Sequence, residues 1–212
     1  MGVIQKGILG GFSGKVGTVV GASWRGKDVI RSLPKKGQRK ATELQEIQRL
    51  KFTLVAKFLS PIKPVVSAYF GQAIAEKSKY NLATSYHMTE AVTGNNPDFV
   101  IDFLKVILTK GDLLGILNPD ANPDANATIV FNWTDNSGEG QAVAQDQVLA
   151  MVYNTSKKSF EYRQTARRSE GTFTIELPLT WSGDSVHCWL SVVSTDAKKY
   201  SLSSYMGELV LL

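Results

Sequence analysis

Alternating apolar and polar residues dominate the chain after residue 126. Ile129, Phe131 and Trp133 fall on one face of a predicted strand, because successive side chains of a strand point to opposite faces. Turn residues separate six such segments, which span residues 127–133, 146–154, 159–164, 171–179, 185–194 and 203–212. Short strands at this spacing indicate a β-sandwich of the immunoglobulin or fibronectin-III type over residues 118–212.

Residues 41–117 show the spacing of helices instead. The first predicted helix covers residues 42–59, and two further helices are expected over residues 64–76 and 81–92. The apolar stripe of the first helix consists of Leu44, Ile47, Leu50, Leu54 and Phe58. A stripe of this kind predicts that one side of the helix packs on a core.

The helical region is expected to end in a strand hairpin. An apolar run covers residues 99–109, and Lys110-Gly111 after it is a turn signal. Asn118-Pro-Asp-Ala is then repeated at once as Asn122-Pro-Asp-Ala. This tandem repeat of turn-forming residues indicates a linker turn before the sandwich.

The N-terminal segment is rich in glycine and in strand-forming residues. Residues 1–33 hold eight of the 18 glycines. They predict a hairpin with strands near residues 16–24 and 28–32 that turns at Arg25-Gly26-Lys27. Because glycine weakens an isolated strand, we expect an arm that becomes ordered by packing on another surface. The residues predicted to make this assembly contact are Phe12, Val16, Val19, Trp24, Arg25 and Arg31.

Charge is distributed unevenly along the chain. Residues 1–40 contain nine lysines or arginines and one acid, which gives a net charge of +8, whereas residues 41–212 contain 15 bases and 18 acids, which gives −3. A basic arm of this kind favours contact with a negative surface, either nucleic acid or an acidic face of a neighbouring subunit. A merely solvated terminus is the alternative.

The basic linker after the arm is the best candidate for a nucleic-acid contact. Its cations are Lys35, Lys36, Arg39 and Lys40. Lysine and arginine bind phosphates without reading sequence, but stacking on bases needs several aromatic residues, and the arm offers only Trp24. A solvated linker remains the competing interpretation.

The sequence shows no motif typical of a catalytic, metal or cofactor site. Gly14-Lys15 is followed by Val16 rather than by serine or threonine, so a phosphate-binding loop is not predicted. The chain has two histidines and a single cysteine, Cys188, which we expect to be a small buried side chain. No metal site and no cofactor are predicted, and the carboxylates do not have the spacing of a calcium loop. We therefore expect a protein that is not an enzyme.

One pair of residues on a late strand suggests a binding patch. Cys188 is expected to face the core, so His187 and Trp189 on either side of it fall on the opposite, outer face. They could form a surface patch for a carbohydrate or a protein, although a half-exposed pair on a sheet is the simpler interpretation of the pattern.

A stretch near the N-terminus carries a distinctive motif. The residues from Gly11 to Gly21 read Gly-Phe-Ser-Gly-Lys-Val-Gly-Thr-Val-Val-Gly, and Trp24, Gly26 and Arg31 follow. This stretch resembles the opening of a family of uncharacterised Bacteroidota proteins, and the segments starting at Asp146 and Cys188 are similar to the same family. The resemblance implies a bacterial or bacteriophage origin and brings no assigned activity.

The sequence thus predicts an α+β protein with three parts. These are a glycine-rich arm over residues 1–40, a helical region with a strand hairpin over residues 41–117, and the sandwich over residues 118–212. The expected function is that of a structural or assembly subunit of a filament, a surface or a phage-derived particle. Its expected partners are copies of itself or other subunits. A nucleic-acid-associated protein and a carbohydrate- or protein-binding module are the alternatives. No signal peptide or membrane segment is predicted, which favours the cytoplasm or a particle assembled there.

Overall fold

The chain forms two compact units in a computed structural model. Residues 2–4, 10–24, 26–34, 40–73 and 77–212 are described. The first unit is Met1–Thr42 and the second is Glu43–Leu212. The fold is α+β and mostly β, with several antiparallel sheets. The predicted end of the arm lies two residues before the boundary between the units, whereas residues 41–117 and 118–212 belong to one unit.

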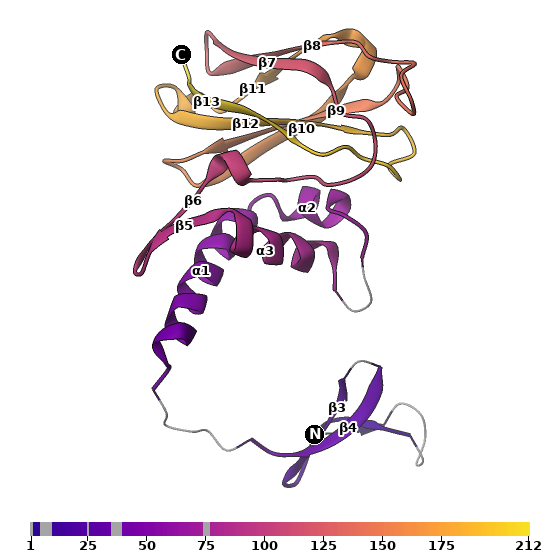
Figure 1. The fold of residues 1–212 in the computed structure, drawn as a ribbon, viewed down its shortest axis with the longest axis vertical. Coiled ribbons are helices and arrows are strands. Elements are labelled where there is room, and N and C mark those ends of the chain that lie inside the picture. The colour runs from indigo at the N-terminus through magenta and orange to yellow at the C-terminus, as the bar shows by residue number, and fades with distance from the viewer. Residues whose placement is uncertain (1, 5–9, 25, 35–39, 74–76) are drawn as a thin grey trace. The chain divides into compact units, whose positions relative to one another are not determined.

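The first unit is a small antiparallel sheet, here called the N-terminal sheet. Its strands are β1 (Val3–Ile4), β2 (Phe12–Val16), β3 (Val19–Trp24) and β4 (Lys27–Ser32), in that spatial order. Figure 1 labels β3 and β4. The predicted hairpin is confirmed as β3 and β4. A turn at Gly17, whose φ is +59°, divides the first predicted strand and creates β2, because glycine adopts this backbone conformation without strain.

The second unit begins with helices. They are α1 (Glu43–Leu59), α2 (Lys63–Tyr69) and α3 (Lys79–Glu90), and the hairpin β5 (Val92–Asn95) and β6 (Asp98–Ile101) and the short 3-10 helix η1 (Phe103–Lys105) follow. Ser78 caps α3 by accepting a hydrogen bond from the backbone N–H of Asn81 at 3.2 Å. All three predicted helices are present, but the second ends at Tyr69 instead of residue 76, because Phe70 is extended. The apolar run over residues 99–109 supplies only a short strand.

Two further sheets complete the second unit. The strands are β7 (Leu117–Asp124), β8 (Thr128–Thr134), β9 (Gln147–Asn154), β10 (Ser159–Arg167), β11 (Thr172–Glu176), β12 (Ser185–Val193) and β13 (Ser204–Val210), with 3-10 helices η2 (Arg168–Glu170) and η3 (Leu179–Trp181). One sheet has the order β10-β9-β12-β13 and the other the order β11-β8-β7. All six strands predicted after residue 126 are present.

The tandem Asn-Pro-Asp-Ala repeat is a strand, and its interpretation as a linker turn was wrong. It forms β7, which pairs only with β8 in its sheet. Proline cannot donate a backbone hydrogen bond to a ladder, so it is tolerated at a sheet edge. Pro119 lies where the register shifts and Pro123 lies on the edge strand, so both are compatible with pairing that the local composition did not reveal.

Two hydrophobic cores separate three layers of the second unit. One core joins the helices to the four-stranded sheet and includes Phe58 of α1 and Trp189 of β12. The other joins the two sheets and includes Phe131 of β8 and Cys188 of β12. In Figure 1 the helices accordingly lie on one side of the four-stranded sheet and the three-stranded sheet lies on the other. The four-stranded sheet is therefore covered on both faces.

A buried ion pair stabilises the connections between these layers. Arg168 is fully buried and Asp146 is 2% exposed. The guanidinium Nη2 lies 3.3 Å from the Asp146 carboxylate, and its other N–H groups donate to the carbonyls of Leu114 and Gly115 and to the side chain of Asn136 at 2.6–2.9 Å. The guanidinium charge and its N–H donors thus have partners, which is the condition for a buried ion pair to be tolerated.

None of the helices in the described parts of the chain is long and apolar enough to cross a membrane.

Candidate assembly interface

The N-terminal sheet holds the residues predicted for assembly. Phe12 and Val16 lie on β2, Val19 and Trp24 on β3, and Arg31 on β4. The sixth predicted residue, Arg25, lies outside the described residues. The cross-strand register decides which of these side chains share a face, because residues directly opposite in an antiparallel pair point to the same side.

One face of the N-terminal sheet is apolar. Gly14 pairs with Gly21, and Gly21 pairs with Ile30, so their side of the sheet also carries the residues two positions away along each strand. We call this side the apolar face; its large side chains are Phe12, Val16, Val19 and Ile30. Ile30 is 68% exposed and Val16 is 51% exposed. The unit therefore leaves much of its apolar surface in contact with solvent.

Gly21 allows Phe12 of the neighbouring strand to pack closely at the centre of this face. A Cβ atom at residue 21 would lie 2.0 Å from the carbonyl oxygen of Phe12 and 2.6 Å from its ring. Phe12 therefore packs directly on the glycine, and any side chain at residue 21 would push the two strands apart. The close approach explains one glycine of the motif in structural terms.

The opposite face of the N-terminal sheet is basic. Lys15 pairs with Val20, Val20 with Arg31, and Trp24 with Lys27, so three cations surround a strip of apolar residues on the same side. We call this side the basic face. Trp24 is 60% exposed. Lys27 was not among the predicted contact residues. Its position opposite Trp24 across the predicted hairpin could have identified it from the sequence.

The basic linker is described only in part. Lys40 is exposed, whereas Lys35, Lys36 and Arg39 lie outside the described residues. The structure therefore places one of the four candidate nucleic-acid contacts.

His187 and Trp189 do not form a surface patch, so this prediction was wrong. His187 is 5% exposed and Trp189 is fully buried. The His187 ring stacks on Phe103 of η1 with centroids 3.7 Å apart, and its Nδ1 is hydrogen-bonded to the hydroxyl of Tyr205 at 2.7 Å. The alternation of β12 was assigned correctly, but helices and η1 cover the face that was expected to meet solvent.

Comparison with known proteins identifies a family. The family of unknown function DUF6266 matches residues 11–207. The chain belongs to this family. The match begins at the first residue of the glycine motif and includes β2, β3 and β4 of the N-terminal sheet and nearly all of the second unit. No curated protein matches the chain.

Two titratable groups buried in the second unit, Cys188 and His87, are held in unreactive states. Burial raises the pKa of the Cys188 thiol to about 12, so the nucleophilic thiolate is scarce near neutral pH. Burial lowers the pKa of His87 to about 4, although a hydrogen bond from Nδ1 to the Ala83 carbonyl partly opposes this. Within the described residues no group of three or more histidine, cysteine or acidic side chains could hold a metal ion.

Stability should fall in mild acid because of His87. Its folded pKa lies below the ordinary value of 6.5, so the unfolded chain takes up a proton first. The contribution of the neutral His87 to the free energy of unfolding is fully present above pH 6.5. As the pH falls below 6.5, this contribution decreases by about 1.4 kcal/mol per pH unit, to a total loss of about 3 kcal/mol near pH 4. Urea unfolding at pH 7.5, 6 and 5 measures this slope, and His87→Gln should flatten it.

His187 provides the comparison for that experiment. Burial also lowers its pKa, and Glu208 partly opposes the shift. His187→Gln should therefore leave most of the slope of the wild-type chain in place. A slope that survives His87→Gln unchanged would show that His87 is not the group that titrates.

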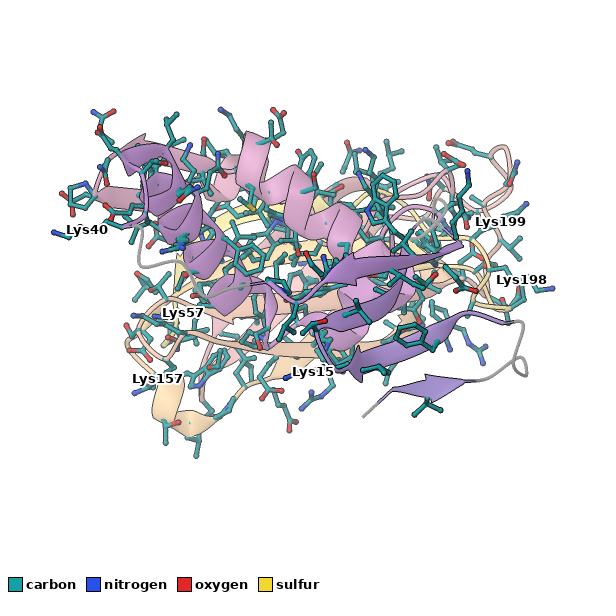
Figure 2. All side chains as sticks on the ribbon, turned by 90° about the horizontal axis from the view of Figure 1, so that it is seen from below. Lys15, Lys40, Lys57, Lys157, Lys198 and Lys199 are labelled. Carbon is teal, nitrogen blue, oxygen red and sulfur yellow. The ribbon has the colours of Figure 1, made fainter. Side chains whose placement is uncertain are left out.

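A basic hollow lies at one end of the second unit. It has a volume of about 750 Å³, and its lining includes Lys110, Lys198, Lys199 and one acid, Asp112. The Lys199 ammonium donates to the Gln141 side chain at 2.8 Å. Figure 2 shows Lys198 and Lys199 extending outward from the ribbon. The hollow has the charge to attract anions, but its cations are surface side chains rather than a preorganised site.

Proposed function

We propose that the chain is a non-enzymatic structural or assembly subunit whose N-terminal sheet contacts another subunit. The observation that carries the proposal is the exposure of large apolar side chains on a sheet of its own. Ile30 on the apolar face and Trp24 on the basic face are both more than half exposed. A sheet gains stability when an apolar face packs against another layer, and a unit of about 40 residues is too small to provide that layer.

The charge distribution supports a partner made of protein. The arm carries +8 and the rest of the chain −3. Two copies can therefore attract each other when the arm of one meets the body of the next. The sequestered states of His87 and Cys188 agree with a role that needs no reactive side chain.

The body suits a role as a structural module. Seven strands, β7 to β13, form the two packed sheets. The first, second and fifth of them in chain order (β7, β8 and β11) form one sheet, and the other four form the second. We propose that this is an immunoglobulin- or fibronectin-III-like sandwich. Modules of this architecture recur in extracellular and surface assemblies, so we further propose a filament, a surface layer or a phage-derived particle as the setting.

Trp24→Ala should weaken self-association most among single substitutions in the arm. A desolvated tryptophan at a protein contact contributes about 2 kcal/mol or more, equivalent to roughly a 30-fold rise in Kd. Sedimentation velocity over a concentration series measures this effect on the full chain. Leu104→Ala is the matched control, because Leu104 is 79% exposed on η1 of the second unit, and it should leave association unchanged.

The proposal has a clear contrary outcome. A wild-type chain that stays monomeric at every concentration tested, in low and high salt, has no assembly contact for Trp24 to support. Equal effects of the two substitutions would also count against it, because they would point to general stickiness rather than to the N-terminal sheet.

A further inference from the structure

The outward face of the three-stranded sheet is mostly polar and negatively charged. The register of β11-β8-β7 puts Asp120 and Asp124 of β7, Val130 of β8 and Glu176 of β11 on this side. The remaining positions are threonine or asparagine, apart from Leu117 opposite Thr134, and the described residues of this face include no lysine or arginine. We call this side the outer face; the opposite side of the same sheet packs in the core.

Within the part of the chain that the structure describes, the carboxylates of the outer face are not neutralised. Among the described residues, none of the three takes part in an ion pair. Asp120 accepts a hydrogen bond from the Asn122 amide at 2.6 Å, which is a neutral partner. The base in the adjoining groove, Arg163, is already paired with Glu161 at 3.1 Å. The outer face therefore presents a net charge of three negative units to its surroundings.

The basic face of the N-terminal sheet complements the outer face in charge and in form. Both are faces of antiparallel sheets with short strands. Lys27 and Arg31 lie four residues apart on β4, and Asp120 and Asp124 lie four residues apart on β7. At a rise of about 3.3 Å per residue, each pair of charges spans about 13 Å. Two ion pairs can therefore form at once when the faces meet.

We infer that the outer face is the docking site for the basic face of the N-terminal sheet of a second copy. This inference rests on the proposed function and names the surface that receives the arm. Trp24 and Val130 supply apolar area at the centre of the contact, while the charges on β4 and β7 lie at its rim. Different surfaces of the two copies meet, so the contact is head-to-tail and leads to a ring or an open filament.

The contact should be sensitive to salt, because the faces are small and attract each other through opposite charges. A few short strands offer less area than a standard protein interface, so a single contact is weak and depends on the opposite charges. Screening by salt acts strongly on exposed charges, with a Debye length of about 10 Å at 0.1 M and about 3 Å at 1 M. Association of the wild-type chain should therefore fall by at least tenfold between these two concentrations.

A charge exchange tests the docking site directly. One variant carries Lys27→Glu and Arg31→Glu, and the other carries Asp120→Lys and Asp124→Lys. Each variant alone should remain monomeric in sedimentation velocity, because both of its faces then have the same sign. An equimolar mixture should associate again, since each reversed face finds a reversed face of opposite sign on the other variant. Circular dichroism and thermal unfolding of each variant verify that it is folded.

The outcomes separate this inference from the proposed function. A monomeric wild-type chain overturns both. A wild-type chain that associates while the Asp120 and Asp124 variant associates equally well overturns the docking site alone. Should that variant not fold, Glu176→Lys and the salt series on the wild-type chain test the same charges. Binding of a short DNA duplex that needs Lys27 and Arg31, without self-association, would assign the basic face to nucleic acid and overturn the docking site.

Discussion

Replacing Arg168 with methionine is expected to lower the free energy of unfolding of the second unit by about 3–5 kcal/mol. The substitution leaves the Asp146 carboxylate buried without its countercharge, and it removes the donors to the carbonyls of Leu114 and Gly115. Leaving such groups unpaired costs far more than the pair itself contributes. Urea unfolding at pH 7, followed by tryptophan fluorescence, measures the change.

Arg163→Met is the matched control for that measurement. Its guanidinium also pairs with a carboxylate, that of Glu161 at 3.1 Å, but both side chains are partly exposed, at 49% and 33%. An exposed pair contributes less than about 1 kcal/mol. A double variant, Arg168→Met with Asp146→Leu, should recover part of the loss because no buried charge remains. Similar losses for Arg168→Met and Arg163→Met would show that burial does not govern the effect.

Local pattern was sufficient to predict most elements of the second unit. The helix α1 and the alternation of strands such as β8 depend on residues close together in sequence, and both elements are where the pattern indicated. The predicted stripe of α1 packs on the core only at its C-terminal end, since Phe58 is buried whereas Leu44 is 76% exposed. β7 was missed because its Asn-Pro-Asp composition is typical of a turn, and only pairing with β8 makes it a strand. Pairing between strands is a non-local interaction that composition does not record.

Burial of the second face of a sheet was likewise not visible in the sequence. The alternation on β12 correctly separated Cys188 from His187 and Trp189. Which side would meet solvent depended on where the helices and η1 pack, and these lie far away in sequence. The Arg168–Asp146 pair joins residues 22 positions apart through contacts with loops, and no spacing rule predicts such a network.

The candidate interface, too, could be predicted only in part from the sequence. The excess of positive charge in the arm was evident from composition, and Trp24 was named from the sequence as a contact residue, which stays a prediction. That Lys15, Lys27 and Arg31 share one face required the register of three strands. The carboxylates on β7 that we propose as their partners could not be anticipated, because Asp120 and Asp124 were assigned to a linker turn.

Deleting residues 1–40 is expected to abolish self-association while the second unit stays folded. Both hydrophobic cores consist of residues from Val55 onward, so the deletion removes no buried core side chain, and hydrophobic burial dominates stability. The midpoint of thermal unfolding should therefore shift by less than about 2 °C, an effect of under about 1 kcal/mol for a domain of this size. Sedimentation velocity and thermal unfolding of the truncated and full chains, compared at equal concentration, measure both properties. A truncated chain that unfolds or aggregates, beside a full-length chain that is a stable monomer, would make the N-terminal sheet a part of the chain's own fold.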